Sequence, residues 1–231
     1  MKYIAIDAST EACSVALSID NKIAGEFELC PQSHSLLLLP MIDRVLNSAN
    51  TNLAELDGII FGRGPGSFTG VRIGIGVVQG LAFAADLRLV GVSTMQAMAQ
   101  QAYNEHKQET VLAAIDARMS EVYTCLFQLD DNGIMQPIIE EQVLAPEKVQ
   151  ASLPEGLASA YAVGTGFDAY PEILSSLKLQ AGSPDILYPD ARAMFRSGIS
   201  LFNHGQSVAP EDAQPTYVRD TVSWKKLPGR E

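Results

Sequence analysis

The sequence has few basic residues for its length. Lys and Arg number 16 among 231 residues, against 27 Asp and Glu, so the formal net charge is -11 and the isoelectric point is near 4.7. Tight, autonomous binding to nucleic acid needs clustered Lys and Arg that neutralise phosphates. The composition opposes such binding, and a role on RNA would require a basic partner.

Cysteine and histidine are also scarce. The three cysteines are an odd set without Cys-x-x-Cys spacing, which argues against a disulfide framework and against a zinc knuckle. We expect Cys13, Cys30 and Cys125 to be reduced and to serve mostly in packing. The three histidines lie far apart in the sequence, so no pair is spaced to hold a metal on one helix. We predict no metal and no cofactor of the protein's own.

The sequence shows neither a signal region nor a long apolar run. Asp7 interrupts the N-terminal segment before an apolar signal region can form, and no later stretch of about 18 apolar residues appears. The 47% of apolar residues suffices for an ordinary core, with room for one large domain or two small ones. We therefore expect a globular, cytoplasmic protein that does not enter a membrane.

Glycine is abundant in residues 61–84, where a buried strand expected over 56–61 is joined to a helix. Three glycines in the turn allow backbone conformations that are closed to other residues. Because bare amides at a helix N-terminus attract anions, a phosphate cradle is one interpretation. The Lys-Ser/Thr pair of a P-loop and the Gly-x-Gly-x-x-Gly spacing are both missing. These absences favour a tight turn that Ser67 or Thr69 caps.

The helix expected from Gly70 to Ala84 has almost no polar side chains. Arg72 and Gln79 are its only strongly polar residues, so it lacks the solvated face of a surface helix. Its small residues recur at four-residue spacing and would let a second helix approach the backbone. They are Gly70, Gly74, Gly76, Gly80 and Ala84. We expect its own sheet on one side and a partner on the other. Arg72 needs a carboxylate or backbone carbonyls, which it could meet within the fold or across an interface.

The first part of the chain reads in the order βββαβαβα. Its first three strands form a meander. The expected strands cover residues 2–7, 12–19, 22–29, 56–61 and 88–92. The expected helices cover about 33–49, 70–84 and 93–105. Ser33 or Ser35 caps the first of these helices, with Pro40 in its early turns or kinking it.

The pattern starts again near Val111. The run Ala5-Ile6-Asp7-Ala8 recurs as Ala114-Ile115-Asp116-Ala117, and each copy enters a hairpin. In the second hairpin we expect strands over 122–127 and 134–144, joined by a turn that ends in Asn132-Gly133. A strand over 160–163 then runs into Gly164-Thr165-Gly166, as the earlier strand runs into its own glycine turn.

These echoes predict a duplicated α/β unit with its seam near 106–110. The first half covers residues 1–106 and the second covers 107–231, with a late helix over 192–204. The tail from about 208 is expected to pack back on the first half. From Tyr217 onward this tail is locally basic, so contact with a partner or with tRNA phosphate is the alternative. Its charged residues and only tryptophan are Arg219, Asp220, Trp224, Lys225, Lys226, Arg230 and Glu231.

Two such halves, each with an Asp at the first turn, are typical of the actin, hexokinase and Hsp70-like (ASKHA) superfamily. Motifs along the whole chain also resemble the bacterial TsaB (YeaZ) family. They are Asp7-Ala8-Ser9-Thr10-Glu11, Ser33-His34-Ser35 with Leu39-Pro40, the glycine-dense run 62–74, Asp116-Ala117-Arg118 with Glu121-Val122-Tyr123, and Trp224-Lys225-Lys226-Leu227-Pro228-Gly229. The run over 62–74 is the specific motif among them.

The resemblance implies a non-catalytic subunit for making N6-threonylcarbamoyladenosine beside the anticodon of tRNAs that read codons beginning with A. Such a subunit works with the catalytic subunit TsaD and the small ATPase TsaE, and meets tRNA only through them. It pairs with itself when TsaD is absent, and ATP, ADP and metal are expected on the partner subunits. We predict that the two apolar helices form the partner interface through His34, Leu37, Met41, Gly70, Arg72, Gly74, Gly76, Val77 and Gly80.

The alternative is a stand-alone ASKHA-type kinase or ATPase that uses Asp7, Asp116 and the glycine loop. ATP-hydrolysing members of the superfamily place small residues directly after the first Asp, whereas side chains follow both aspartates here. An Asp at a strand end also commonly caps its own turn. Ser67 lacks a Gly-x-Ser-x-Gly elbow and a nearby histidine. His34 is expected to cap or pack at the first helix, so we predict no catalytic residue.

Overall fold

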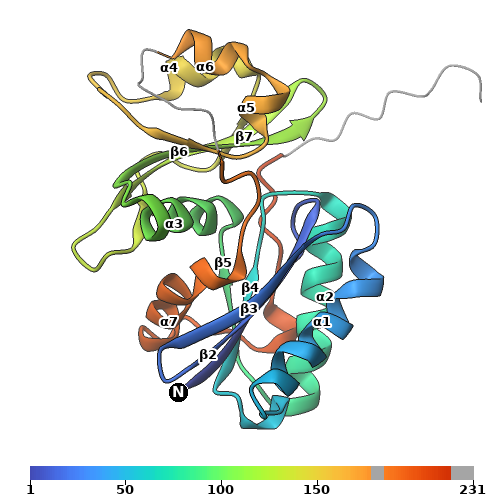
Figure 1. The fold of residues 1–231 in the computed structure, drawn as a ribbon. Coiled ribbons are helices and arrows are strands. Elements are labelled where there is room, and N and C mark those ends of the chain that lie inside the picture. Colours follow the sequence, from blue (N-terminus) through green and yellow to red (C-terminus); the bar gives the residue numbers. More distant parts are fainter. Residues whose placement is uncertain (178–184, 220–231) are drawn as a thin grey trace, which may run out of the picture.

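The computed structural model describes residues 1–177 and 185–219, which fold into two lobes, each built on a mixed β-sheet (Figure 1). In the first lobe the strand order is β3-β2-β1-β4-β5, antiparallel from β3 to β1 and parallel from β1 to β5. These strands are β1 (Lys2–Asp7), β2 (Ala12–Ile19), β3 (Lys22–Leu29), β4 (Gly58–Gly62) and β5 (Leu89–Val92). The predicted bounds of the first three are confirmed, and the other two start one or two residues later.

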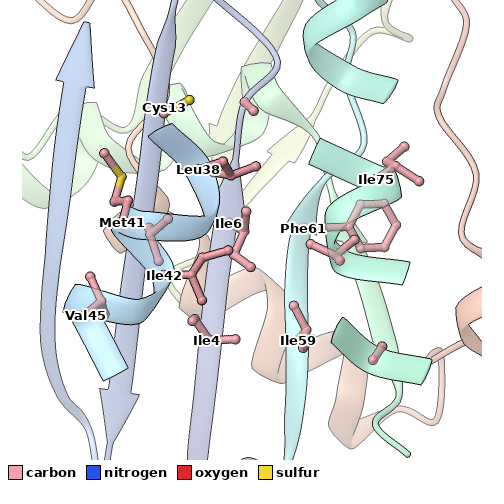
Figure 2. Close-up of a cluster of buried hydrophobic side chains, with 14 of the residues drawn as sticks. Ile4, Ile6, Cys13, Leu38, Met41, Ile42, Val45, Ile59, Phe61 and Ile75 are labelled. Carbon is pink, nitrogen blue, oxygen red and sulfur yellow. The ribbon is translucent and has the colours of Figure 1, made fainter. Parts of the chain in front are cut away.

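Two helices cover one face of this sheet, namely α1 (His34–Ser48) and α2 (Phe68–Ala85). Ser67 caps α2, since its hydroxyl accepts a hydrogen bond from the Gly70 amide at 3.3 Å. Figure 2 shows side chains of α1 and α2 packed against β1 and β4. Among the described residues, α2 has the length and apolar composition of a membrane span, with 33% of it buried.

The opposite face of the first sheet is covered from far along the chain, by a 3-10 turn (Ala191–Met194) and α7 (Phe195–Asn203). The ring of Phe202 stacks on Tyr3 with 4.9 Å between centroids. Gly198 allows this close approach, because a side chain there would meet Ile60. The expectation that the helix over 192–204 completes the second half is therefore wrong. Its apolar stripe packs on the first sheet.

The second lobe repeats the strand pairing that opens the first. Strand β6 pairs antiparallel with β7 and parallel with β10, just as β1 pairs with β2 and β4. The strands are β6 (Thr110–Arg118), β7 (Glu121–Leu129), β8 (Met135–Pro137), β9 (Gln142–Leu144) and β10 (Tyr161–Val163). The single return strand predicted over 134–144 is wrong, since β8 and β9 pair separately with β7. Between them Glu141 leaves the ladder to bond Ser93 and Arg63.

Helices also cover both faces of the second sheet. On one face lies α3 (Thr94–His106), which follows β5 of the first lobe and crosses to pack on the second sheet. On the other face lie α4 (Val149–Ser152), α5 (Gly166–Ala169) and α6 (Glu172–Ser176). Short 3-10 turns cover Leu53–Glu55, Pro146–Lys148 and Pro210–Asp212. Because α3 and α7 each serve the other half's sheet, the packing interleaves the two sequence halves.

The segment after α7 runs back along the first lobe. Val208 bridges Leu89 at the edge of the sheet, and Gln79 on α2 donates to the carbonyls of Pro210 and Ala213 at 2.9 and 3.2 Å. Arg219 reaches Glu121 of the second lobe. Residues 208–216 thus pack on the first half, as the sequence suggested. The basic residues and tryptophan from 224 onward lie outside the described residues.

Candidate partner-binding groove and aspartate turns

A shallow groove runs along α2 beside α1, with a volume of about 540 Å³. The two helices lie side by side on the outer side of the first lobe (Figure 1). The groove is lined by Leu39, Arg72, Ile73, Gly76, Val77, Gly80 and Leu81. Since all but Arg72 present only carbon side chains or bare backbone, the groove suits an apolar ridge of another protein.

The glycines of α2 divide between its two sides. Gly70 and Gly74 face inward against the turn after β1, where the Cβ of Ala8 would lie 3.5 Å from a Cβ on Gly74. Gly76 and Gly80 face outward, and a side chain on either would meet nothing within 4 Å. The inner pair therefore allows close packing within the lobe, while the outer pair leaves a bare strip of helix backbone at the surface.

Helix α1 also has apolar residues both on a buried side and on an exposed side. Met41 is fully buried, and Figure 2 shows it beside Leu38 and Ile42 on the side of α1 that packs in the core. On the other side Leu36 and Leu39 are 74% and 48% exposed. The buried side of α1 thus packs in the core, while two of its leucines, Leu36 and Leu39, are largely exposed to solvent.

The nine predicted interface residues do not all lie together. Four of them line the groove, namely Arg72, Gly76, Val77 and Gly80. Leu37 is half-buried on α1. The remaining four are buried inside the lobe: His34, Met41, Gly70 and Gly74.

Sequence reasoning missed the exposed apolar residues of α1 and α2. Leu36, Leu39, Phe68 and Phe83 are between 48% and 81% exposed. The signal was present in the leucine run 36–39, because four consecutive leucines on a helix point in all directions and some must leave the core.

Within the chain, Arg72 lies over an aromatic ring and not beside the expected carboxylate or backbone carbonyls. The alternative, that such a partner meets Arg72 across an interface, stays a prediction. Its guanidinium carbon is 3.3 Å from the ring centroid of Phe68, and its Nε donates to the Tyr217 hydroxyl at 2.9 Å. Cation–π contact of this kind holds the side chain while leaving its charge exposed. The salt bridges of the described residues do not include Arg72, so a cation without an acidic partner lines the otherwise apolar groove.

The turn after β1 is closed around Asp7. The Asp7 carboxylate is buried and accepts hydrogen bonds from the Ser9 amide at 2.9 Å and the Ser9 hydroxyl at 2.8 Å. Burial raises the pKa of Asp7 from 3.8 to about 6, although the hydrogen bonds from Ser9 act against this rise. The carboxylate thus caps its own turn.

The glycine loop packs on that same turn. The Ser67 amide donates to the Ser9 carbonyl at 2.7 Å, and a side chain on Gly66 would collide with the same carbonyl. The Gly70 amide is used by the Ser67 hydroxyl. Because these amides already have partners within the chain, the loop offers them to no phosphate as it stands.

The corresponding turn after β6 is also filled by side chains. Arg118 donates to the Asp116 carboxylate through its amide at 2.9 Å and its guanidinium at 2.8 Å, and the same guanidinium reaches Glu11 of the first lobe at 2.9 Å. Tyr170 donates to Asp116 at 3.3 Å. An Arg and a Tyr therefore occupy the oxygens that a magnesium ion would need.

Known proteins resemble the chain in both sequence and structure. The family model TsaD, tRNA N6-adenosine threonylcarbamoyltransferase, matches residues 28–185. The tRNA threonylcarbamoyladenosine biosynthesis protein TsaB of Escherichia coli is 46% identical over 231 residues, covering 100% of both chains. Its namesake in Haemophilus influenzae is 43% identical over 238 residues, covering 100% of this chain and 99% of the relative.

A solved structure gives the same result. YeaZ from Pseudomonas aeruginosa superposes with a TM-score of 0.87 at 42% identity, covering 94% of this chain and 99% of that one. The duplicated ASKHA-type α/β fold and the predicted family are both confirmed. The chain belongs to the TsaB (YeaZ) family.

Proposed function

We propose that this chain is a non-catalytic subunit in the biosynthesis of N6-threonylcarbamoyladenosine, next to the anticodon of tRNAs that read codons beginning with A. Full-length relatives are named as biosynthesis proteins for this nucleoside, and the matching family model is named for the threonylcarbamoyltransferase. In this proposal the groove beside α2 receives the TsaD-type catalytic subunit.

The observation that carries the proposal is the bare outer side of α2. The helix is apolar enough to span a membrane, yet only 33% of it is buried within its own lobe. Gly76 and Gly80 leave room for a second helix to touch the backbone, and exposed Phe83 and Leu39 extend the apolar surface. Such a surface is typical of a protein-protein interface.

The two aspartate turns support a subunit without chemistry of its own. Catalysis of phosphoryl transfer needs acidic oxygens free for a metal and backbone free for phosphate. Here Ser9 engages Asp7, Arg118 and Tyr170 engage Asp116, and the loop amides bond to Ser9 and Ser67. We therefore place nucleotide and catalytic metal on the partner subunits.

Further partners follow from the same proposal. A TsaE-type ATPase joins the complex, and a second copy of the chain covers the groove when the catalytic subunit is absent. With a net charge of -11 the chain meets tRNA only through the complex, in the cytoplasm.

Association with a TsaD-type subunit of the same organism tests the groove. Gly80→Leu fills the open strip and should weaken binding by about 5- to 100-fold, which corresponds to about 1 to 3 kcal/mol of packing conflict. Ala151→Leu is the matched control, since Ala151 is an exposed small residue on α4 of the other lobe. Titration calorimetry gives the affinities and circular dichroism checks the fold. Equal binding by parent and Gly80→Leu would place the interface elsewhere.

A further inference from the structure

Two cysteines and a histidine meet inside the first lobe, at the start of α1. Cys13 lies on β2, Cys30 directly follows β3, and His34 is the first residue of α1. Their exposures are 0%, 4% and 8%. One ligand atom from each lies within 4.8 Å of the other two. Neither the fold nor the proposed function makes use of this chemistry.

The strand register sets the two sulfurs close together without favouring a disulfide. Cys13 pairs with Glu28, and the Cys30 amide donates to the Glu11 carbonyl at 2.9 Å, so the cysteines are diagonal neighbours on one face. Diagonal neighbours have Cα atoms about 7 to 8 Å apart, whereas the Cα atoms of a disulfide lie about 4.4 to 6.8 Å apart. Thiolates on one zinc ion, each about 2.3 Å from the metal, need no such approach.

One ring nitrogen of His34 has the kind of backbone partner that metal-binding histidines commonly have. Its Nε2 lies 2.6 Å from the carbonyl oxygen of Thr10. Because a carbonyl only accepts hydrogen bonds, Nε2 carries the proton and Nδ1 keeps the lone pair. A backbone carbonyl that fixes the tautomer in this way is a common second layer around metal sites.

We propose that Cys13, Cys30 and His34 bind one zinc ion. Thiolate and imidazole are the ligands that zinc prefers, and three protein ligands leave a fourth position to a small exchangeable ligand. Two thiolates and a neutral imidazole balance the charge of Zn²⁺, whereas Cu⁺ would leave a net negative charge in a buried site.

The ion ties together three segments that converge here, namely β2, the end of β3 and the start of α1. Zinc that binds the folded chain and not the unfolded one raises the melting temperature. The same stabilisation fixes the start of the helix beside the groove. The proposal does not depend on the proposed function, because the site is internal and its ion takes no part in tRNA chemistry.

The test is metal binding by the purified full-length chain under reducing conditions. Chelator-treated protein is titrated with Zn²⁺ against a chromogenic competitor, with Cu⁺ in a separate arm. Co²⁺ serves as a probe, because thiolate ligation gives it a near-ultraviolet charge-transfer band. We expect one equivalent of Zn²⁺, a thiolate-cobalt band, and a melting temperature raised by several degrees.

Cysteine variants identify which side chains bind the metal. Cys13→Ala and Cys30→Ala should each lose the cobalt band and weaken zinc binding at least tenfold, while Cys125→Ala should keep both. Cys125 is the matched control, since it is equally buried but lies in the second lobe. The proposal is overturned if the parent protein shows no thiolate-cobalt band, if Cys30→Ala binds zinc as the parent does, if only Cu⁺ binds, or if Cys13 and Cys30 form a disulfide in place of binding metal.

Discussion

The carboxylate of Asp7 occupies the space that a side chain on Gly62 would need. Gly62 ends β4, and its neighbour β1 ends at Asp7, so the two residues meet where the parallel strands finish. Here the space is taken up by packing between the glycine loop and the Asp7 turn.

Gly62→Ala should therefore destabilise the protein. The added methyl group collides with Asp7, which must give up its hydrogen bonds with Ser9. Overpacking of this kind costs about 1 to 3 kcal/mol, which lowers the melting temperature of a chain of this size by about 2 to 12 °C. Differential scanning calorimetry measures the change.

Gly76→Ala is the matched control for that experiment. A methyl group on Gly76 meets nothing within 4 Å, and replacing an exposed helical glycine by alanine gains up to about 1 kcal/mol. Its melting temperature should equal or exceed that of the parent. If both variants have the melting temperature of the parent, the close contact between Gly62 and Asp7 does not contribute to stability.

Asp7→Asn should become stabilising as the pH rises. Burial raises the pKa of Asp7 from 3.8 to about 6, so between these values the folded protein binds the proton that the unfolded chain releases. This group's contribution to stability thus falls from about pH 4 to pH 6 and stays low above it. The difference between the two pKa values corresponds to about 3 kcal/mol.

Denaturant unfolding of both proteins at pH 4, 5, 6 and 7 measures this effect. Asparagine keeps an acceptor for the Ser9 amide and cannot ionise, so the variant should match the parent at pH 4 and exceed its unfolding free energy by up to about 3 kcal/mol at pH 7. A stability difference that is constant over this range would show that Asp7 does not titrate as described.

Local patterns predicted the first lobe well because its signals are local. The meander pattern predicted the bounds of β1 to β3, and Ser67 and Ser93 cap α2 and α3, which were also expected. The broken return strand was not predictable, because Glu141 leaves the sheet for Ser93, 48 residues away. Likewise, the apolar stripe of α7 predicts that the helix packs against a sheet, but it does not indicate which of the two sheets.

Which of the predicted site residues are exposed, and which lie close together, was harder to predict from the sequence. Since α2 is apolar on all sides, its sequence did not show that Gly74 faces the core and Gly80 faces solvent. The cluster of Cys13, Cys30 and His34 was missed because its spacing matches no zinc motif. Strand register and the turn into α1 bring the three together.

The purified chain should show no ATP turnover above background. Both aspartates are engaged by neighbouring side chains, and the loop amides are bonded within the chain. A sensitive phosphate-release assay on the parent, Asp7→Ala and Asp116→Ala proteins decides the point. Turnover that purifies with the parent and disappears in either variant would favour the kinase or ATPase alternative.

The chain alone should bind tRNA only weakly at physiological salt. With 16 basic residues against 27 acidic ones it can neutralise few phosphates. Filter binding or fluorescence anisotropy over a salt series measures the affinity, and a basic tRNA-binding protein serves as the positive control. Tight binding that persists at about 0.2 M salt would mean that basic groups gather on one face despite the net charge.

The threonylcarbamoyladenosine content of cellular tRNA tests the central claim most directly. Cells whose only copy of this gene encodes the parent, Gly80→Leu or Ala151→Leu are grown alike, and their tRNA is digested and analysed by mass spectrometry. We predict normal modified nucleoside with the parent and Ala151→Leu, and a severe loss with Gly80→Leu at equal protein level. Normal content with Gly80→Leu, or in cells that lack the chain altogether, would contradict the account.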